Sequence, residues 1–162
     1  MNWTAANTWA ENLVYDGYDD WHLPTTPDGT WGYNSFQNST KYNVTVSDLG
    51  HLFYTLLGNQ VTLDSSATFN SISYGPGYPG LFTNLQAGYY WFGTLSNTTD
   101  SSSNKMGWIF DFQHGCQFLA STNQNAYAIA VRKAEPVPEP TSAVLFLSGL
   151  AGFCCYRSKQ NY

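Results

Sequence analysis

The chain has 162 residues, of which 17% are aromatic and 10% are charged, and its formal net charge at pH 7 is −5. This acidity disfavours a polyanionic partner, so we expect no binding to nucleic acid. Residues 1–133 have the length of one domain. Cys116 is the one cysteine in this stretch, which leaves no partner for a disulfide within the domain.

The first predicted element is an amphipathic helix over residues 4–15. Its apolar side chains recur at helical spacing and would form one stripe. They are Ala6, Trp9, Ala10, Leu13 and Val14. Asn2 or Thr4 can cap its start, and Asp16-Gly17 is expected to end it because glycine suits the left-handed position after a helix.

A second helix is predicted over residues 48–57, with Ser47 as its N-cap. Its apolar stripe also has helical spacing. The stripe comprises Leu49, Leu52, Phe53, Leu56 and Leu57. The chain between the two helices is expected to be extended over 18–25 and loop-like over 26–45.

Strands are predicted in the second half of the domain, after irregular structure over 59–88. The predicted strands cover 89–95, 106–112, 116–120 and 127–133, with a turn at His114-Gly115. Alternation in the second of these strands places Trp108, Phe110 and Phe112 on one face. A polar loop is expected over 96–104. Two helices followed by an antiparallel sheet meander predict an α+β domain.

The end of the chain has three parts in a fixed order. The motif Pro138-Glu139-Pro140 comes first, an uncharged apolar run over 141–156 follows, and Arg157 and Lys159 lie beyond it. An apolar span with basic residues on one flank is typical of a membrane segment whose basic end stays in the cytoplasm. As a helix, the run would span roughly 24 Å at ~1.5 Å per residue, short of the ~30 Å hydrocarbon core. That length favours a transient, processed segment over a permanent anchor.

This tail resembles the PEP-CTERM sorting signal, which an exosortase recognises. The resemblance implies a Pro/Glu linker with the sorting motif over 134–140, a hydrophobic transmembrane helix over 141–156 and a basic cytoplasmic end over 157–162. It also implies a bacterial protein that passes the inner membrane toward the cell surface or extracellular matrix. An ordinary C-terminal anchor and a buried core helix are the alternatives. Residues 1–3 run directly into the first predicted helix without a signal peptide, so we expect the true N-terminus to lie upstream.

Several stretches of residues 3–133 resemble a second family. They are Trp9-Ala10-x-x-Leu13, Gly17-Tyr18-x-Asp20-Trp21-His22-Leu23-Pro24-Thr25, Tyr90-Trp91, Trp108-x-Phe110-x-Phe112-x-x-Gly115 and Ala130-Val131-Arg132. Together they resemble the Lcl C-terminal-like domain, which is similar in fold to C-type lectin-like and formylglycine-generating-enzyme-like domains. The family usually has Arg at the position of His22. It also has a strand before the first helix, whose absence would leave 127–133 as an unpaired edge.

Neither catalysis nor a metal site is predicted. The histidines His22, His51 and His114 fall in no recognisable Ser/His/Asp or Cys/His pattern, and we interpret each as structural or solvated. The cysteine pair of the formylglycine-generating enzymes has no counterpart here, so their activity is not carried over. The acidic residues after the first helix follow no EF-hand pattern and are interpreted as a solvated turn. They are Asp16, Asp19 and Asp20. We expect no cofactor.

Exposed aromatic side chains are the predicted means of ligand binding, because their flat surfaces stack on the apolar faces of sugar rings. Trp31, Tyr74 and Tyr78, in predicted loops, are the candidates. Other large aromatics are expected in the core, namely Trp9, Trp21, Trp91, Trp108, Phe110 and Phe112. The net acidity favours a neutral polysaccharide or a surface protein as the partner. The alternatives are a purely structural matrix component and an enzyme related to the formylglycine-generating enzymes.

Overall fold

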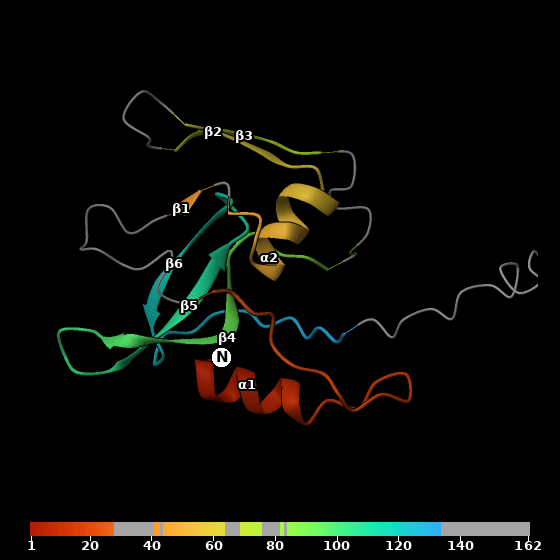
Figure 1. Cartoon of the computed structure of the whole chain (residues 1–162), viewed down its shortest axis with the longest axis vertical. Helices are drawn as coiled ribbons and strands as arrows, with labels where there is room; N and C mark the ends of the chain where they lie inside the picture. Colours follow the sequence, from red (N-terminus) through yellow and green to blue (C-terminus); the bar gives the residue numbers. More distant parts are fainter. Residues whose placement is uncertain (28–40, 43, 64–68, 76–81, 83, 134–162) are drawn as a thin grey trace, which may run out of the picture. The chain divides into compact units, whose positions relative to one another are not determined.

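The computed structural model describes residues 1–27, 41–42, 44–63, 69–75, 82 and 84–133 (Figure 1). The chain divides into two units, Met1–Arg132 and Lys133–Tyr162. The fold described below is that of the first unit. The predicted sorting motif, hydrophobic helix and basic end lie outside the described residues, as do Trp31 and Tyr78. No helix within the described ranges has the length and apolar character that a membrane crossing requires.

The first unit is an α+β domain with short helices and antiparallel sheets, which confirms the predicted class. Its helices are α1 (Trp3–Glu11), α2 (Asp48–Gly50) and the π-helix η1 (His51–Leu56); its strands are β1 (Lys41–Tyr42), β2 (Gln60–Leu63), β3 (Phe69–Ser73), β4 (Tyr89–Thr99), β5 (Lys105–Asp111) and β6 (Cys116–Ser121). A four-stranded sheet has the order β1-β6-β5-β4, and β2 pairs with β3 in a separate two-stranded sheet.

The helix α1 begins at the predicted cap but ends earlier than predicted. The side chain of Asn2 accepts a backbone hydrogen bond at 2.9 Å, which satisfies one of the free amides of the first turn. Asn12 is the C-cap residue. The predicted end at Asp16-Gly17 is therefore wrong.

Those two residues form a tight hairpin turn instead. Asp16 has φ 52° and Gly17 has φ 79°, the two positive values that a type I′ turn requires. Tyr15 and Tyr18 close the turn by exchanging two backbone hydrogen bonds of 3.0 Å. Asp-Gly is a preferred pair for this turn, and here the turn forms in place of the predicted helix end.

Burial of α1 also differs from the predicted stripe. Ala6 and Ala10 are fully buried against the sheet, whereas Trp9 is 40% exposed and Val14 is 72% exposed. Trp3 lies on the buried side, with its indole N–H donating to the Phe92 carbonyl at 2.9 Å. The small alanine side chains let the helix pack closely on the sheet, and this shifts the inward face toward Trp3.

The sheet has a core on each face. Ile109 lies in the core beneath α1, together with Ala6, Ala10, Leu23, Trp91 and Ala120. Trp108, Phe110 and Phe112 lie in the opposite core with Phe53, as the predicted alternation requires. Figure 1 shows α1 and α2 on opposite sides of this sheet.

The second helical segment confirms one prediction and refines it. Ser47 caps its start by accepting a hydrogen bond from the Gly50 amide at 3.2 Å. Its last turns are π-helical over His51–Leu56, a rare form that the apolar spacing did not indicate. The apolar stripe is largely buried, with Leu49, Leu52, Phe53 and Leu57 at 8% exposure or less.

Three strand predictions need correction. The hairpin of β2 and β3 occupies part of the segment 59–88 that was predicted to be irregular. Strand β4 continues to Thr99, through half of the predicted polar loop. No regular strand spans 127–133: Tyr127 pairs with Tyr90, and Val131 pairs with His22, through isolated bridges. This last segment is therefore paired at two points rather than left as an unpaired edge.

Candidate ligand-binding surface

Two tyrosine side chains project together from the hairpin that follows α1. Tyr15 and Tyr18 are direct partners across the turn, and side chains of directly opposed residues lie on the same face of a strand pair. Tyr15 is 66% exposed and Tyr18 is 42% exposed. The turn thus presents two aromatic rings to solvent at one place.

Trp21 contacts both tyrosine residues of this pair. Its ring meets the Tyr15 ring edge-on, with centroids 6.1 Å apart and planes at 67°. Its indole N–H donates to the Tyr18 carbonyl at 3.2 Å. Because Trp21 contacts both arms of the hairpin, it limits their relative movement. We call Tyr15, Tyr18 and Trp21 the aromatic hairpin surface.

Arg132 fixes the same hairpin from the far end of the domain sequence. Its guanidinium carbon lies 3.6 Å from the centroid of the Tyr18 ring. Its Nε donates to Oδ1 of Asp20 at 2.8 Å, and its Nη2 donates to Oδ2 at 3.3 Å. The hydrogen bond from Arg132 is the main cause that lowers the pKa of Asp20. Arg132 therefore holds the chain after the hairpin turn at two points, the Tyr18 ring and the Asp20 carboxylate.

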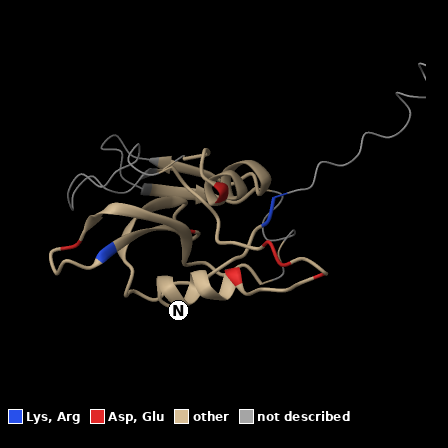
Figure 2. Cartoon of the chain, turned by 60° about the horizontal axis from the view of Figure 1, so that its bottom comes forward, with Lys and Arg blue, Asp and Glu red and all other residues tan. Residues whose placement is uncertain are grey.

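The charge next to this cluster is mainly acidic: Asp16 and Asp19, both exposed, are sequence neighbours of the two tyrosines. Figure 2 shows Lys, Arg, Asp and Glu sparsely distributed over the described part of the domain. Asp20 is engaged by Arg132, whose side chain is 18% exposed. The surface therefore offers aromatic rings beside exposed carboxylates, a combination that disfavours a polyanion and suits a ligand without negative charge.

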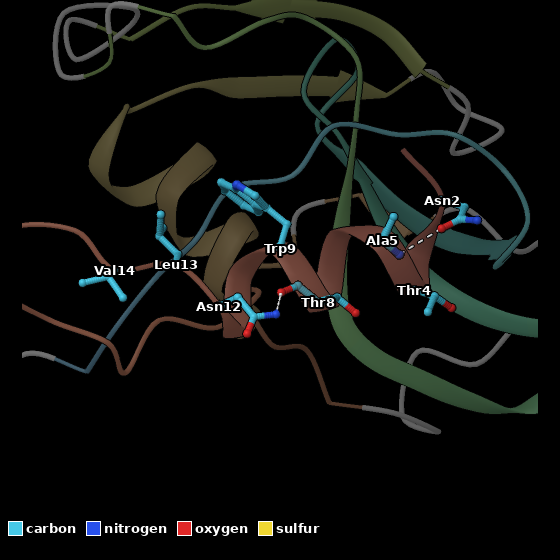
Figure 3. A pocket seen from close by; sticks show the side chains of 8 residues that line it. All are labelled: Asn2, Thr4, Ala5, Thr8, Trp9, Asn12, Leu13 and Val14. Carbon is cyan, nitrogen blue, oxygen red and sulfur yellow. Dashed lines mark hydrogen bonds between the residues drawn. The ribbon is translucent and has the colours of Figure 1, made fainter.

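A shallow, open groove lies along the outer side of α1, with described lining residues from the helix and its two flanks only. It has a volume of about 910 Å³ and is lined in part by Thr8, Trp9, Asn12 and Val14. Figure 3 shows Trp9 and Leu13 projecting from the same side of the helix. Asn12 donates to the Thr8 carbonyl at 2.8 Å, which holds its amide at the groove. Since Val14 directly precedes Tyr15, the groove and the hairpin belong to one continuous stretch of chain.

The structure describes one of the three aromatic residues predicted to bind ligand. Tyr74 is 50% exposed and follows β3, as a contact residue would need. Of the aromatics predicted to be core, Trp91, Trp108, Phe110 and Phe112 are fully buried. Trp9 is the clear exception, and Trp21 is half-buried. The exposed pair Tyr15 and Tyr18 was missed because Asp16-Gly17 was interpreted as a helix end; the alternative, a hairpin turn, was the available signal.

Three titratable side chains outside this surface lie in or beside the β5–β6 turn, namely Asp111, His114 and Cys116. His114 Nδ1 lies 2.6 Å from Oδ2 of Asp111, whose other oxygen accepts from the Gln113 amide at 2.8 Å. Asp111 thereby organises the turn. Burial, with a smaller contribution from Asp111, raises the pKa of the Cys116 thiol to about 12. Cys116 therefore stays a protonated thiol near neutral pH and is a poor nucleophile.

The other histidines make local contacts or face solvent. His22, at the position where the resembled family has Arg, places Nδ1 2.8 Å from the Leu23 carbonyl. His51 is exposed. Across the described ranges, no three His, Cys, Asp or Glu side chains converge as a metal ion would require.

No protein-family model, curated protein or solved structure matches this chain. The class of this protein therefore follows from its sequence and structure alone. They define an α+β domain with an exposed aromatic hairpin, followed in sequence by the tripartite tail.

Proposed function

We propose that this chain is a non-enzymatic, exported bacterial protein of the cell surface or extracellular matrix whose domain binds a neutral polysaccharide. The observation that supports this most directly is the aromatic hairpin surface, on which Tyr15 and Tyr18 are exposed while Trp21 and Arg132 hold them in place. The C-type lectin-like fold implied by the resemblance is part of the same proposal.

Physical chemistry favours this assignment of the surface. Aromatic rings bury the C–H faces of sugars, and the tyrosine hydroxyls supply hydrogen bonds at the edge of the contact. Side chains that are already ordered lose little conformational entropy on binding. The Trp21 and Arg132 contacts provide that order. The groove along α1 gives an extended chain a place to continue beyond the hairpin.

The tail supplies the proposed route. Pro138-Glu139-Pro140 is the proposed sorting motif, and Arg157 and Lys159 form the basic flank that stays in the cytoplasm. An exosortase would act on the chain at the inner membrane, after export. The mature protein would then join the exopolysaccharide layer or a protein partner at the cell surface.

One experiment tests the binding. The full chain, purified in mild detergent, is titrated with neutral polysaccharides (amylose, mannan and a β-1,3-glucan), and with heparin as a polyanionic control. Saturable binding to a neutral polymer and none to heparin is the expected result. If no neutral polymer binds saturably, the polysaccharide assignment is wrong and a structural matrix role is favoured instead. The tail is tested separately by the mass of the mature protein in its own host, where an intact, unprocessed C-terminus would contradict sorting.

A further inference from the structure

A hollow distinct from the aromatic hairpin surface lies on the four-stranded sheet. Strands β4 and β5 continue beyond the core as a projecting hairpin, visible in Figure 1. Between this hairpin and the end of β6 is a hollow of about 510 Å³. Small-molecule sites typically have volumes of ~300–1,000 Å³. It shares no described lining residue with the groove along α1.

The floor of the hollow is apolar. Met106 of β5 and Leu119 of β6 contribute to it, and Leu119 is 5% exposed. Pairing of Met106 with Ser121 brings these strands into register at this level of the sheet. Phe118 of β6 also lines the hollow and adds to its apolar surface.

The rim of the hollow is polar and comes from two stretches of chain, 98–101 and 121–124. Thr98 lies in β4, Asp100 follows β4, Ser121 ends β6, and Gln124 belongs to the turn after it. Hydroxyl and amide groups that converge on an apolar floor are the usual composition of a site for a small polar ligand. Such groups can both donate and accept hydrogen bonds, which suits the hydroxyls of a sugar.

A negative charge at the rim disfavours anionic ligands. Asp100 is the charged residue among the described lining residues. Its Oδ1 accepts from the amides of Ser102 and Asn104 at 2.9 Å, and its Oδ2 accepts from the Asn104 side chain at 3.0 Å. Hydrogen bonds from Asn104, with smaller contributions from the Ser102 amide and the Ser121 side chain, lower the pKa of Asp100, so its carboxylate is ionised at neutral pH. A fixed negative charge repels anionic ligands, and its oxygens are already occupied by donors of its own turn.

We propose that this hollow is a second binding site, specific for a single neutral, polyhydroxylated ring such as one sugar residue. The apolar floor would contact the C–H face of the ring. The side chains of Thr98, Ser121 and Gln124 would bond its hydroxyls. The site is independent of the aromatic hairpin surface, so either can be present without the other.

The test uses the full chain and small probes of known charge. Methyl glucoside, methyl mannoside and methyl galactoside are titrated and followed by NMR shifts of the Met106 methyl group, with methyl glucuronide as the anionic counterpart. Saturable shifts with at least one neutral glycoside, and about tenfold weaker binding of the glucuronide, are expected. Ser121→Tyr fills the hollow and should abolish the shifts. Gln124→Ala, which adds no bulk, should weaken binding several-fold.

Ser102→Tyr is the matched control. It introduces the same side chain at the tip of the same hairpin, at a position outside the described lining, and should leave the affinity unchanged. No saturable shift with any neutral glycoside would overturn the proposal, as would binding that survives Ser121→Tyr in a folded protein. Tyr15→Ala should leave these shifts intact. Weaker polysaccharide binding by Tyr15→Ala, with these shifts unchanged, thus separates failure of one site from failure of the other.

Discussion

Arg132 stacks its guanidinium on the ring of Tyr18, with the central carbon 3.6 Å from the ring centroid. The same guanidinium is paired with Asp20 at 2.8 Å. The last described residues of the domain thereby hold the hairpin that follows the first helix. Planar stacking combined with a two-point contact to a carboxylate is a geometry that arginine can provide and lysine cannot.

Replacing Arg132 by lysine should therefore loosen the aromatic hairpin surface without removing positive charge. Exposed stacking of a guanidinium on an aromatic ring is worth about 0.5–1 kcal/mol, so affinity for a neutral polysaccharide should fall about two- to fivefold. Polysaccharide titration and the near-ultraviolet circular dichroism of the aromatic cluster measure the effect. Lys133→Ala, a change at the next cation in the chain, is the control. Equal affinities for wild type and Arg132→Lys would show that the stacking does not position the surface.

Binding should also respond to acid. The folded-state pKa of Asp20 is lowered from its ordinary value of 3.8 by the Arg132 hydrogen bond. The contribution of this pair is therefore fully present above that ordinary value and is lost as the pH falls through the lowered pKa. Polysaccharide affinity should be constant from pH 7 to about 4 and decline below it. Asp20→Asn, which cannot ionise, should weaken binding at pH 7 and remove the additional acid dependence; a decline that persists unchanged would assign it to another group.

Local sequence patterns predicted the parts of the fold that depend on local periodicity. Ser47 and Asn2 cap their helices as expected, and alternation placed Trp108 and Phe110 in one core. The α+β class follows from these elements. The buried face of α1 was predicted less well. Ala6 and Ala10 are buried as predicted, whereas Trp9, which was placed on the same face, is exposed.

For the candidate site, the sequence predicted the type of residue, exposed aromatics, but not the residues Tyr15 and Tyr18. Exposed aromatics were expected, but Asp16-Gly17 is compatible both with a helix end and with a hairpin turn, and the positive φ values of both residues show the turn. The pairing of Arg132 with Asp20 joins positions 112 residues apart. No periodicity or spacing encodes a contact over that sequence distance, so the support of the hairpin required the structure.

Two tyrosines of similar exposure offer a direct comparison of the aromatic candidates. Tyr15→Ala removes a ring from the aromatic hairpin surface, and loss of one stacking contact of about 1 kcal/mol should weaken polysaccharide binding about fivefold. Tyr74→Ala, at 50% exposure against 66% for Tyr15, should change binding less. Titration of both variants beside wild type makes the measurement. The reverse order would transfer the site to the segment after β3, where the sequence predicted it.

The buried thiol of Cys116 should resist alkylation in the native protein. Its pKa of about 12 lies well above the ordinary value of 9.0, so at pH 8 the folded state contains roughly a thousandfold less thiolate than the unfolded state. Iodoacetamide treatment and peptide mass spectrometry should find Cys116 unmodified in buffer and modified in 8 M urea. Because the folded pKa is raised, this group's contribution to stability is present below the unfolded value and is lost as the pH rises above it. Native labelling as fast as labelling in urea would contradict the burial.

Alanine substitutions at two glycines with left-handed backbone conformation allow the cost of backbone strain to be distinguished from the cost of steric overlap. Gly17 has φ 79° and Gly115 has φ 67°, so alanine at either position should cost about 1–2 kcal/mol of unfolding free energy. A Cβ at Gly17 meets nothing within 4 Å, whereas one at Gly115 would lie 2.6 Å from the Phe53 ring and 2.7 Å from Val61. Phe53 is fully buried in the core, so the ring cannot move aside without disturbing its neighbours.

Urea unfolding of the two alanine variants should therefore give unequal losses. Gly115→Ala should lower the unfolding free energy by about 1–3 kcal/mol more than Gly17→Ala, since overpacking adds to the shared backbone strain. Gly17→Asn is a useful third variant, because asparagine tolerates the left-handed region and should be close to wild type. Losses of equal size at Gly17 and Gly115 would mean that Phe53 and Val61 yield at little cost, and that this side of the core is packed less tightly than the distances indicate.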